Sequence, residues 1–110
     1  MKDLLTTAYE AMDEKQADDL VVLDFRGTSP IVDYFIIGSA RNYRMARSII
    51  ENVEDKAAEH GYEVRHTYIE DSSKWLMIDL NDVVCHVFYD GEREYYNLEG
   101  LWKDLPKVKM

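Results

Sequence analysis

The stretch WLMIDLNDVVCHVFY, residues 75–89, decides the fold, because two apolar runs flank the dipeptide Asn81-Asp82. Asn and Asp tolerate a positive φ and are typical of the two-residue loops of tight β-hairpins. The stretch therefore predicts two antiparallel strands, 75–80 and 83–89. With Leu80 opposite Val83, the two-residue period of a strand sets the remaining cross-strand pairs: Asp79 with Val84, Ile78 with Cys85, Met77 with His86, Leu76 with Val87, and Trp75 with Phe88.

The two faces of this predicted hairpin differ in composition. One face is wholly apolar, and we expect it to carry the helices; its residues are Leu76, Ile78, Leu80, Val83, Cys85 and Val87. The other face combines large apolar side chains with an acid and an imidazole; its residues are Trp75, Met77, Asp79, Val84, His86 and Phe88. Aromatic anchors beside a few polar groups are typical of a protein-binding patch. The alternative is that a C-terminal helix with Tyr95, Tyr96 and Trp102 covers this face.

The rest of the chain supplies three helical patterns and three further strands. Apolar residues at helical spacing predict helices over 3–17, from Asn42 to a C-cap at His60-Gly61, and over 92–104. Apolar runs predict strands over 20–25, 33–38 and 62–69, the first two antiparallel neighbours and the third a parallel neighbour of the second through a right-handed crossover. The predicted fold is α+β, with a mixed five-stranded sheet and helices mainly on one face, as a single domain over residues 1–106 with a short basic tail over 107–110.

The charge balance limits the class of partner. The chain has 13 Lys and Arg against 22 Asp and Glu, a formal net charge of −9. Such a chain is repelled by nucleic acid and by anionic membranes, and a basic protein is the favoured partner. Net acid that merely keeps a small protein soluble is the alternative.

The expected compartment is the cytoplasm. Cys85 is the only cysteine, which excludes an internal disulfide and suits a reducing environment. We find no apolar run long enough for a signal peptide or a membrane span.

The residues also carry a family resemblance. The strings SKWLMIDLNDVVCHVF (73–88) and YYNLEGLW (95–102), together with VLD (22–24) and DYFIIGS (33–39), resemble the ribosomal silencing factors, also called the Iojap family. The resemblance covers nearly the whole chain. Two departures concern loops: Asn81 stands where the family usually has a glycine, and Ile69-Glu70 replaces an acid-glycine pair.

The resemblance implies a nucleotidyltransferase-like topology and a protein that binds the large ribosomal subunit at its inter-subunit face, on a small basic β-barrel ribosomal protein. Bound there, it would block joining of the small subunit and turn translation down when nutrients are scarce. Our candidate partner-binding residues are Trp75, Met77, Asp79, Asp82, His86 and Phe88. The basic stripe Arg41, Arg44 and Arg47 favours a solvated helix face, and a minor ribosomal RNA contact is its alternative. A homodimer that uses the Trp75 face also stays open.

Catalytic interpretations are set aside. Gly38-Ser39 matches the strand end of the nucleotidyltransferases, but the pair of carboxylates that would hold Mg²⁺ is missing, since Asp79-Leu80-Asn81 offers one acid only. Cys85 and His86 point to opposite faces of a strand, so they form no dyad. His60, His66, Cys85 and His86 have no recognised zinc spacing. We therefore predict no catalytic residue, metal or cofactor, and keep a nucleotidyltransferase-like enzyme or nucleotide-binding protein as the alternative.

The pair Asp79 and His86 allows two interpretations. In one, Asp79 only orients His86 within the protein. In the other, both side chains lie in the interface and hydrogen-bond to the partner.

Overall fold

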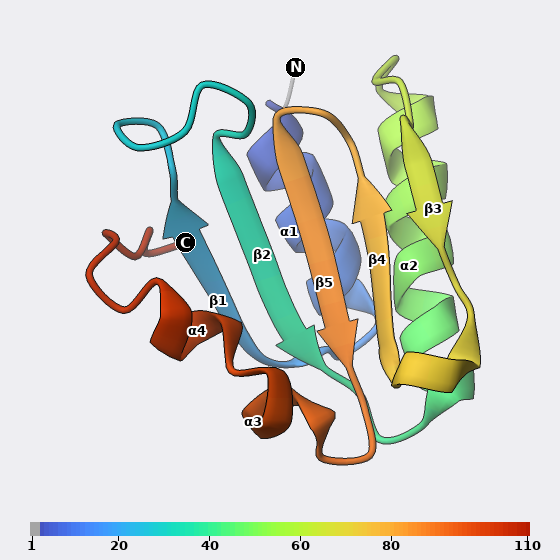
Figure 1. Ribbon diagram of the computed structural model, residues 1–110. Helices are drawn as coiled ribbons and strands as arrows, with labels where there is room; N and C mark the ends of the chain where they lie inside the picture. Colours follow the sequence, from blue (N-terminus) through green and yellow to red (C-terminus); the bar gives the residue numbers. More distant parts are fainter. Residues whose placement is uncertain (1–2) are drawn as a thin grey trace.

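A five-stranded mixed sheet in the order β1-β2-β5-β4-β3 forms the centre of the structure (Figure 1), a computed structural model that describes residues 3–110. The helices α1 and α2 lie behind this sheet in the view of Figure 1, and the short helices α3 and α4 lie in front of it. The elements are α1 (Leu4–Glu14), β1 (Asp18–Asp24), β2 (Tyr34–Ser39), α2 (Tyr43–Glu59), β3 (His66–Tyr68), the 3-10 turn η1 (Asp71–Ser73), β4 (Trp75–Asp79), β5 (Val83–Phe88), α3 (Glu92–Tyr96) and α4 (Leu98–Leu101).

The β4–β5 hairpin has the predicted register, and its five cross-strand pairs run from Trp75 with Phe88 to Asp79 with Val84. The loop closes through a 2.9 Å hydrogen bond from the Leu80 N–H to the Val83 carbonyl. Asn81 has a φ of 77°, a left-handed conformation that Asn adopts more readily than most residues. The tight hairpin is thereby confirmed.

The apolar face of the hairpin packs against α1 and α2, as the sequence predicts. Asp3 and Asn42 cap the two helices: their side chains accept hydrogen bonds from the N–H groups of Thr6 and Met45. A buried stripe along α2 then meets the sheet, and its residues are Ala46, Ile49, Ile50, Val53 and Ala57. In residues 3–110 no helix is long and apolar enough to cross a membrane.

The prediction that the strand over 62–69 pairs parallel with β2 is wrong. The third strand covers only His66–Tyr68 of the expected 62–69, and it pairs antiparallel with β4 at the sheet edge. β5 is instead the parallel neighbour of β2. The physical reason is burial: β5 is apolar along nearly its whole length and occupies the centre, whereas β3 has exposed ends and suits an edge.

The predicted C-terminal helix over 92–104 is two short helices. Asn97 separates α3 from α4 with a φ of 47°, and its side chain accepts a hydrogen bond from the Gly100 N–H. A left-handed residue ends a helix, and Asn tolerates it. The chain therefore bends at Asn97, and α4 follows a different direction from α3 (Figure 1).

A second apolar cluster lies between the C-terminal segment and the face of the sheet opposite α1 and α2. Its buried members are Leu23, Phe25, Ile37, Phe88 and Leu98, with Trp75, Tyr96 and Trp102 partly buried against them. Residues beyond α4 then run along the outer edge of β1. The N–H of Val108 donates to the Val22 carbonyl, and Lys107 forms a β-bridge with Leu23.

Arg93 joins α3 to the sheet. Its guanidinium pairs with Glu99 at 2.7 Å, donates to the Ser39 hydroxyl at 2.8 Å and donates to the Asp19 carbonyl at 2.7 Å. The Arg93 side chain is only 16% exposed, so water competes little for these bonds. One side chain therefore links α3, α4, β1 and β2.

We expect Arg93→Ala to lower the free energy of unfolding by about 2 kcal/mol, since it removes several charge-assisted hydrogen bonds at once. Urea unfolding measures the change. The matched control is Arg44→Ala, on the exposed surface of α2, which should stay within about 0.5 kcal/mol of the parent. Equal effects of the two substitutions would contradict the linking role of Arg93.

Candidate functional site

Trp75 lies at the start of β4, at the end of the sheet where α3 lies (Figure 1). Its half-buried indole stacks on the Phe88 ring, with 5.1 Å between centroids and 30° between planes. Tyr96 of α3 contacts the same indole at 4.8 Å. Phe88 itself is buried beneath these rings, with 1% of its surface exposed. Trp75 is thus anchored by its neighbours while part of it stays open to solvent.

His86 lies beside Trp75 and is 3% exposed. The Trp75 Nε1–H donates a 3.1 Å hydrogen bond to His86 Nδ1, and the Phe35 ring lies 4.5 Å from the imidazole. An indole N–H can only donate, so Nδ1 must be unprotonated and the ring proton belongs to Nε2. Burial lowers the pKa of His86 to about 3. The imidazole is therefore neutral at physiological pH.

Asp79 does not orient His86, which corrects one of the two interpretations of this pair. The Asp79 carboxylate accepts a 2.8 Å hydrogen bond from the Asn81 N–H and so stabilises the hairpin turn. The residue that fixes His86 is Trp75. Because Asp79 is half-exposed and His86 is buried, only Asp79 of this pair is directly accessible to a partner.

The outer part of the same sheet face is partly open. Met77 and Asp79 are half-exposed, and they pair across the strands with Tyr68 and His66 of β3. Tyr68 is exposed, and its ring packs on that of His66. Tyr68 is not among the candidates from the sequence, although its place in a short polar edge strand could have indicated exposure.

The C-terminal segment adds two exposed apolar side chains that the sequence did not single out as site residues. Tyr95 is 78% and Leu101 69% exposed. The Tyr95 ring contacts Tyr96 edge-on, and Tyr96 contacts Trp75, so the three rings are continuous. In the alternative from the sequence, Tyr95 belongs to a C-terminal helix that covers this sheet face. The helix is instead divided at Asn97 into α3 and α4, and both Tyr95 and Leu101 face solvent.

We use the term docking surface for the accessible side chains around Trp75, which are Tyr68, Trp75, Met77, Asp79 and Tyr95. Of the six candidates from the sequence, Trp75, Met77 and Asp79 belong to it. His86 and Phe88 lie beneath it. Asp82 lies elsewhere.

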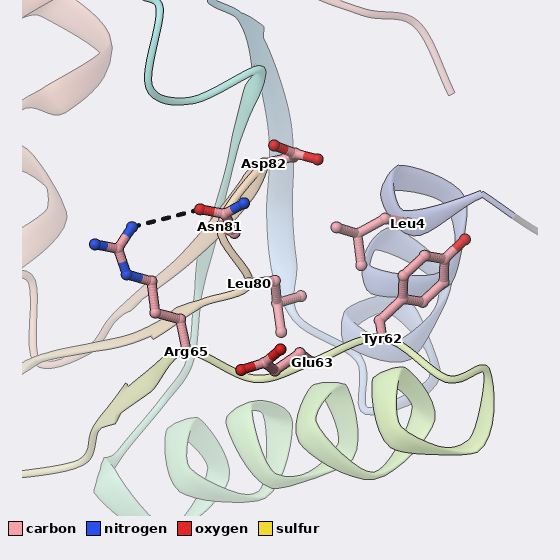
Figure 2. Close-up of a pocket in the computed structure, with 7 residues that line it drawn as sticks. All are labelled: Leu4, Tyr62, Glu63, Arg65, Leu80, Asn81 and Asp82. Carbon is pink, nitrogen blue, oxygen red and sulfur yellow. Dashed lines mark hydrogen bonds between the residues drawn. The ribbon is translucent and has the colours of Figure 1, made fainter.

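Asp82 lies at the opposite end of the hairpin from Trp75. At about 3.4 Å per residue, the five steps from Trp75 to Leu80 span roughly 17 Å. Asp82 lines a cavity of about 420 Å³ whose other walls come from the α1 start, the α2–β3 connection and the turn (Figure 2): Leu4, Tyr62, Glu63, Arg65, Leu80 and Asn81. Arg65 donates a long hydrogen bond to the Asn81 side chain there. The candidates from the sequence therefore divide between two separate places.

Gly38 and Ser39 have structural tasks in this fold. A Cβ at Gly38 would lie 2.9 Å from the Leu20 side chain and 3.3 Å from that of Ala17, so the close approach of these residues favours glycine. The Ser39 hydroxyl accepts from Arg93. Within residues 3–110, no three metal-ligating side chains of His, Cys, Asp or Glu type converge.

Cys85 and the arginines at and just before the start of α2 lie in different environments. Cys85 is buried in the core on the helix side, where burial raises the pKa of its thiol far above the ordinary value. Arg41, Arg44 and Arg47 are exposed. Arg47 pairs with Glu51 at 3.3 Å on the same helix, as expected for a solvated surface.

Comparisons of the sequence and of the structure with known proteins agree with one another. A sequence model of the family described as "Ribosomal silencing factor during starvation" matches residues 1–110. The chain is 41% identical to "Ribosomal silencing factor RsfS" of Bacillus subtilis over 105 residues, which cover 96% of this chain and 89% of the relative. It is 38% identical to the protein of the same name from Halalkalibacterium halodurans, with 99% and 93% covered. A crystal structure from Bacillus halodurans superposes with a TM-score of 0.84 at 37% identity, covering 97% of both chains.

The buried neutral His86 predicts a loss of stability in acid. Its pKa in the fold, about 3, lies below the ordinary value of 6.5, so the unfolded chain binds a proton that the folded chain does not. Stability is therefore full above about pH 6.5 and declines as the pH falls from there toward 3, by about 2 kcal/mol at pH 5. Urea unfolding at about pH 7.5 and pH 5 measures the decline. In His86→Leu this component should vanish, and an unchanged decline would show that other groups cause it.

Proposed function

The chain belongs to the family of ribosomal silencing factors, and we propose that it represses translation by binding the large ribosomal subunit at its inter-subunit face and preventing the small subunit from joining. In this proposal the direct contact is a basic β-barrel ribosomal protein, and repression operates under nutrient limitation. The site of action is the cytoplasm. The protein acts by occupying a surface, without a catalytic step.

The observation that carries the proposal is the docking surface. Trp75 is held by Phe88, Tyr96 and His86, and the exposed Tyr95 continues the row of aromatic rings. Aromatic side chains that are already ordered make strong anchors, since they gain contact area at a low cost in conformational entropy. A rigid aromatic row at the surface supports recognition of a protein.

Charge supports the choice of a basic partner. The net charge of −9 gives the protein a long-range attraction to cationic surfaces, and Asp79 places a carboxylate within the docking surface. Complementary charge raises the association rate and disfavours wrong partners. A basic ribosomal protein meets this requirement better than bare ribosomal RNA, whose phosphates repel an acidic protein.

A steric mechanism requires that the bound domain lie between the two subunits. The domain has extents of 33 × 33 × 22 Å, which exceed the few ångströms that separate two surfaces in direct contact. Such a domain bound at the inter-subunit face excludes the small subunit for as long as it stays bound. The strength of repression therefore depends on the fraction of large subunits occupied.

We expect the protein to co-sediment with isolated large subunits, and not with isolated small subunits. Added before the two subunits are mixed, it should lower the yield of joined ribosomes in proportion to its occupancy of the large subunit, because exclusion is stoichiometric. Sucrose-gradient sedimentation measures both effects. Absence of both at micromolar protein would remove the proposal.

We expect Trp75→Ala to weaken binding to large subunits by about 2 kcal/mol or more, hence about thirtyfold, the usual scale for an aromatic anchor. The control is Ile31→Ala, which removes another exposed apolar side chain from the β1–β2 connection and should leave binding unchanged. Because Trp75 also packs on Phe88, circular dichroism and urea unfolding must show that the variant is folded at the assay temperature. A folded Trp75→Ala variant with parental affinity would place the contact elsewhere.

A further inference from the structure

The Trp75 indole is held in one orientation by three side chains. Phe88 stacks on it, Tyr96 contacts it at 4.8 Å, and the His86 Nδ1 accepts its N–H. The first two contacts are apolar and depend little on direction. The hydrogen bond is directional, so it selects which edge of the indole points into the protein.

Histidine is a costly choice for this buried position. The Nε2 atom of His86 is buried and has no hydrogen-bond partner within residues 3–110. Since Nδ1 accepts from Trp75, Nε2 carries the proton and is a donor without an acceptor, which lowers the stability of the fold. An apolar side chain of similar size would pack against Phe35 without that cost.

The benefit that offsets this cost is the hydrogen bond to Trp75. His86 lies diagonally across the β4–β5 pair from Trp75, since Trp75 pairs with Phe88 and Met77 pairs with His86. Diagonal neighbours are within reach of aromatic side chains. Within the described residues, this is the only hydrogen bond that the buried His86 ring forms.

We propose that His86 is a positioning residue that fixes the Trp75 indole in its docking orientation. The inference rests on the proposed function, since it assumes that Trp75 contacts the partner. His86 is too buried to make that contact, so it acts through Trp75. Fixing the indole beforehand spares the partner the entropic cost of ordering it.

Two substitutions at His86 separate the hydrogen bond from the packing. Asn places its side-chain oxygen where Nδ1 lies relative to Cβ, so His86→Asn keeps an acceptor for the indole N–H but leaves space beside Phe35. His86→Leu fills the space but has no acceptor. Both variants are compared with the parent in affinity for large subunits and in urea unfolding.

We expect the affinity for large subunits to be retained when residue 86 offers a hydrogen-bond acceptor to the indole N–H, and to fall when it does not. His86→Leu should bind about tenfold more weakly than the parent, because the indole is no longer ordered before binding. Its stability should stay close to that of the parent, because removal of the unpaired Nε2–H offsets the loss of the hydrogen bond from Trp75. His86→Asn should be less stable but retain affinity within about threefold of the parent. Unchanged affinity in His86→Leu, or equal losses in both variants, would overturn the inference.

A second readout uses the free protein. The Trp75 indole N–H should give an NMR signal protected from solvent exchange in the parent and in His86→Asn, and this protection should be lost in His86→Leu. The Trp102 indole is the internal reference, identified through Trp102→Phe. If the parent itself does not bind large subunits, the proposed function fails. The indole signal then decides whether His86 holds Trp75, and unchanged protection in His86→Leu would overturn that role too.

Discussion

The rest of the structure depends on the cross-strand pairing of the β4–β5 hairpin. Its two-residue loop allows one register, and that register places every apolar residue of one face toward α1 and α2. A slip by a single residue would turn Cys85 outward and His86 into the main core. The helices α1 and α2 therefore cover that face of the sheet. The other face, with Trp75 and Asp79, is covered in part by the C-terminal segment.

The C-terminal segment covers that second face only in part. Phe88 and Leu98 are buried together, whereas Trp75 stays half-open at the side of the cluster. The left-handed Asn97 ends α3, so Tyr95 and Leu101 belong to separate short helices. With the break, those two side chains lie outside the cluster and extend the accessible apolar surface. Within this one short segment, the aromatic residues Tyr96 and Trp102 pack against the cluster, whereas Tyr95 is exposed.

Membership in the ribosomal silencing factor family gives this surface its biological context. The family is regulatory, and the molecule combines an acidic net charge with a row of contacting aromatic rings. The glycine and serine at the end of β2 serve packing and an arginine contact. The neutral, buried His86 fits the same view. It lowers stability through its unpaired nitrogen and gives Trp75 a defined orientation in return.

Local patterns in the sequence determined the hairpin, its register, the two long helices, the family and the acidic character, because period, turn chemistry and charge depend on residues close together in the chain. Only the tertiary structure decided that β5 lies between β2 and β4, that Asn97 divides the last helix, and that His86 and Phe88 lie beneath the surface while Tyr68, Tyr95 and Leu101 stand open. Neighbours in the sheet are chosen by competition for burial among strands distant in sequence. Exposure likewise depends on which segment returns to cover a face, and no local pattern contains that information.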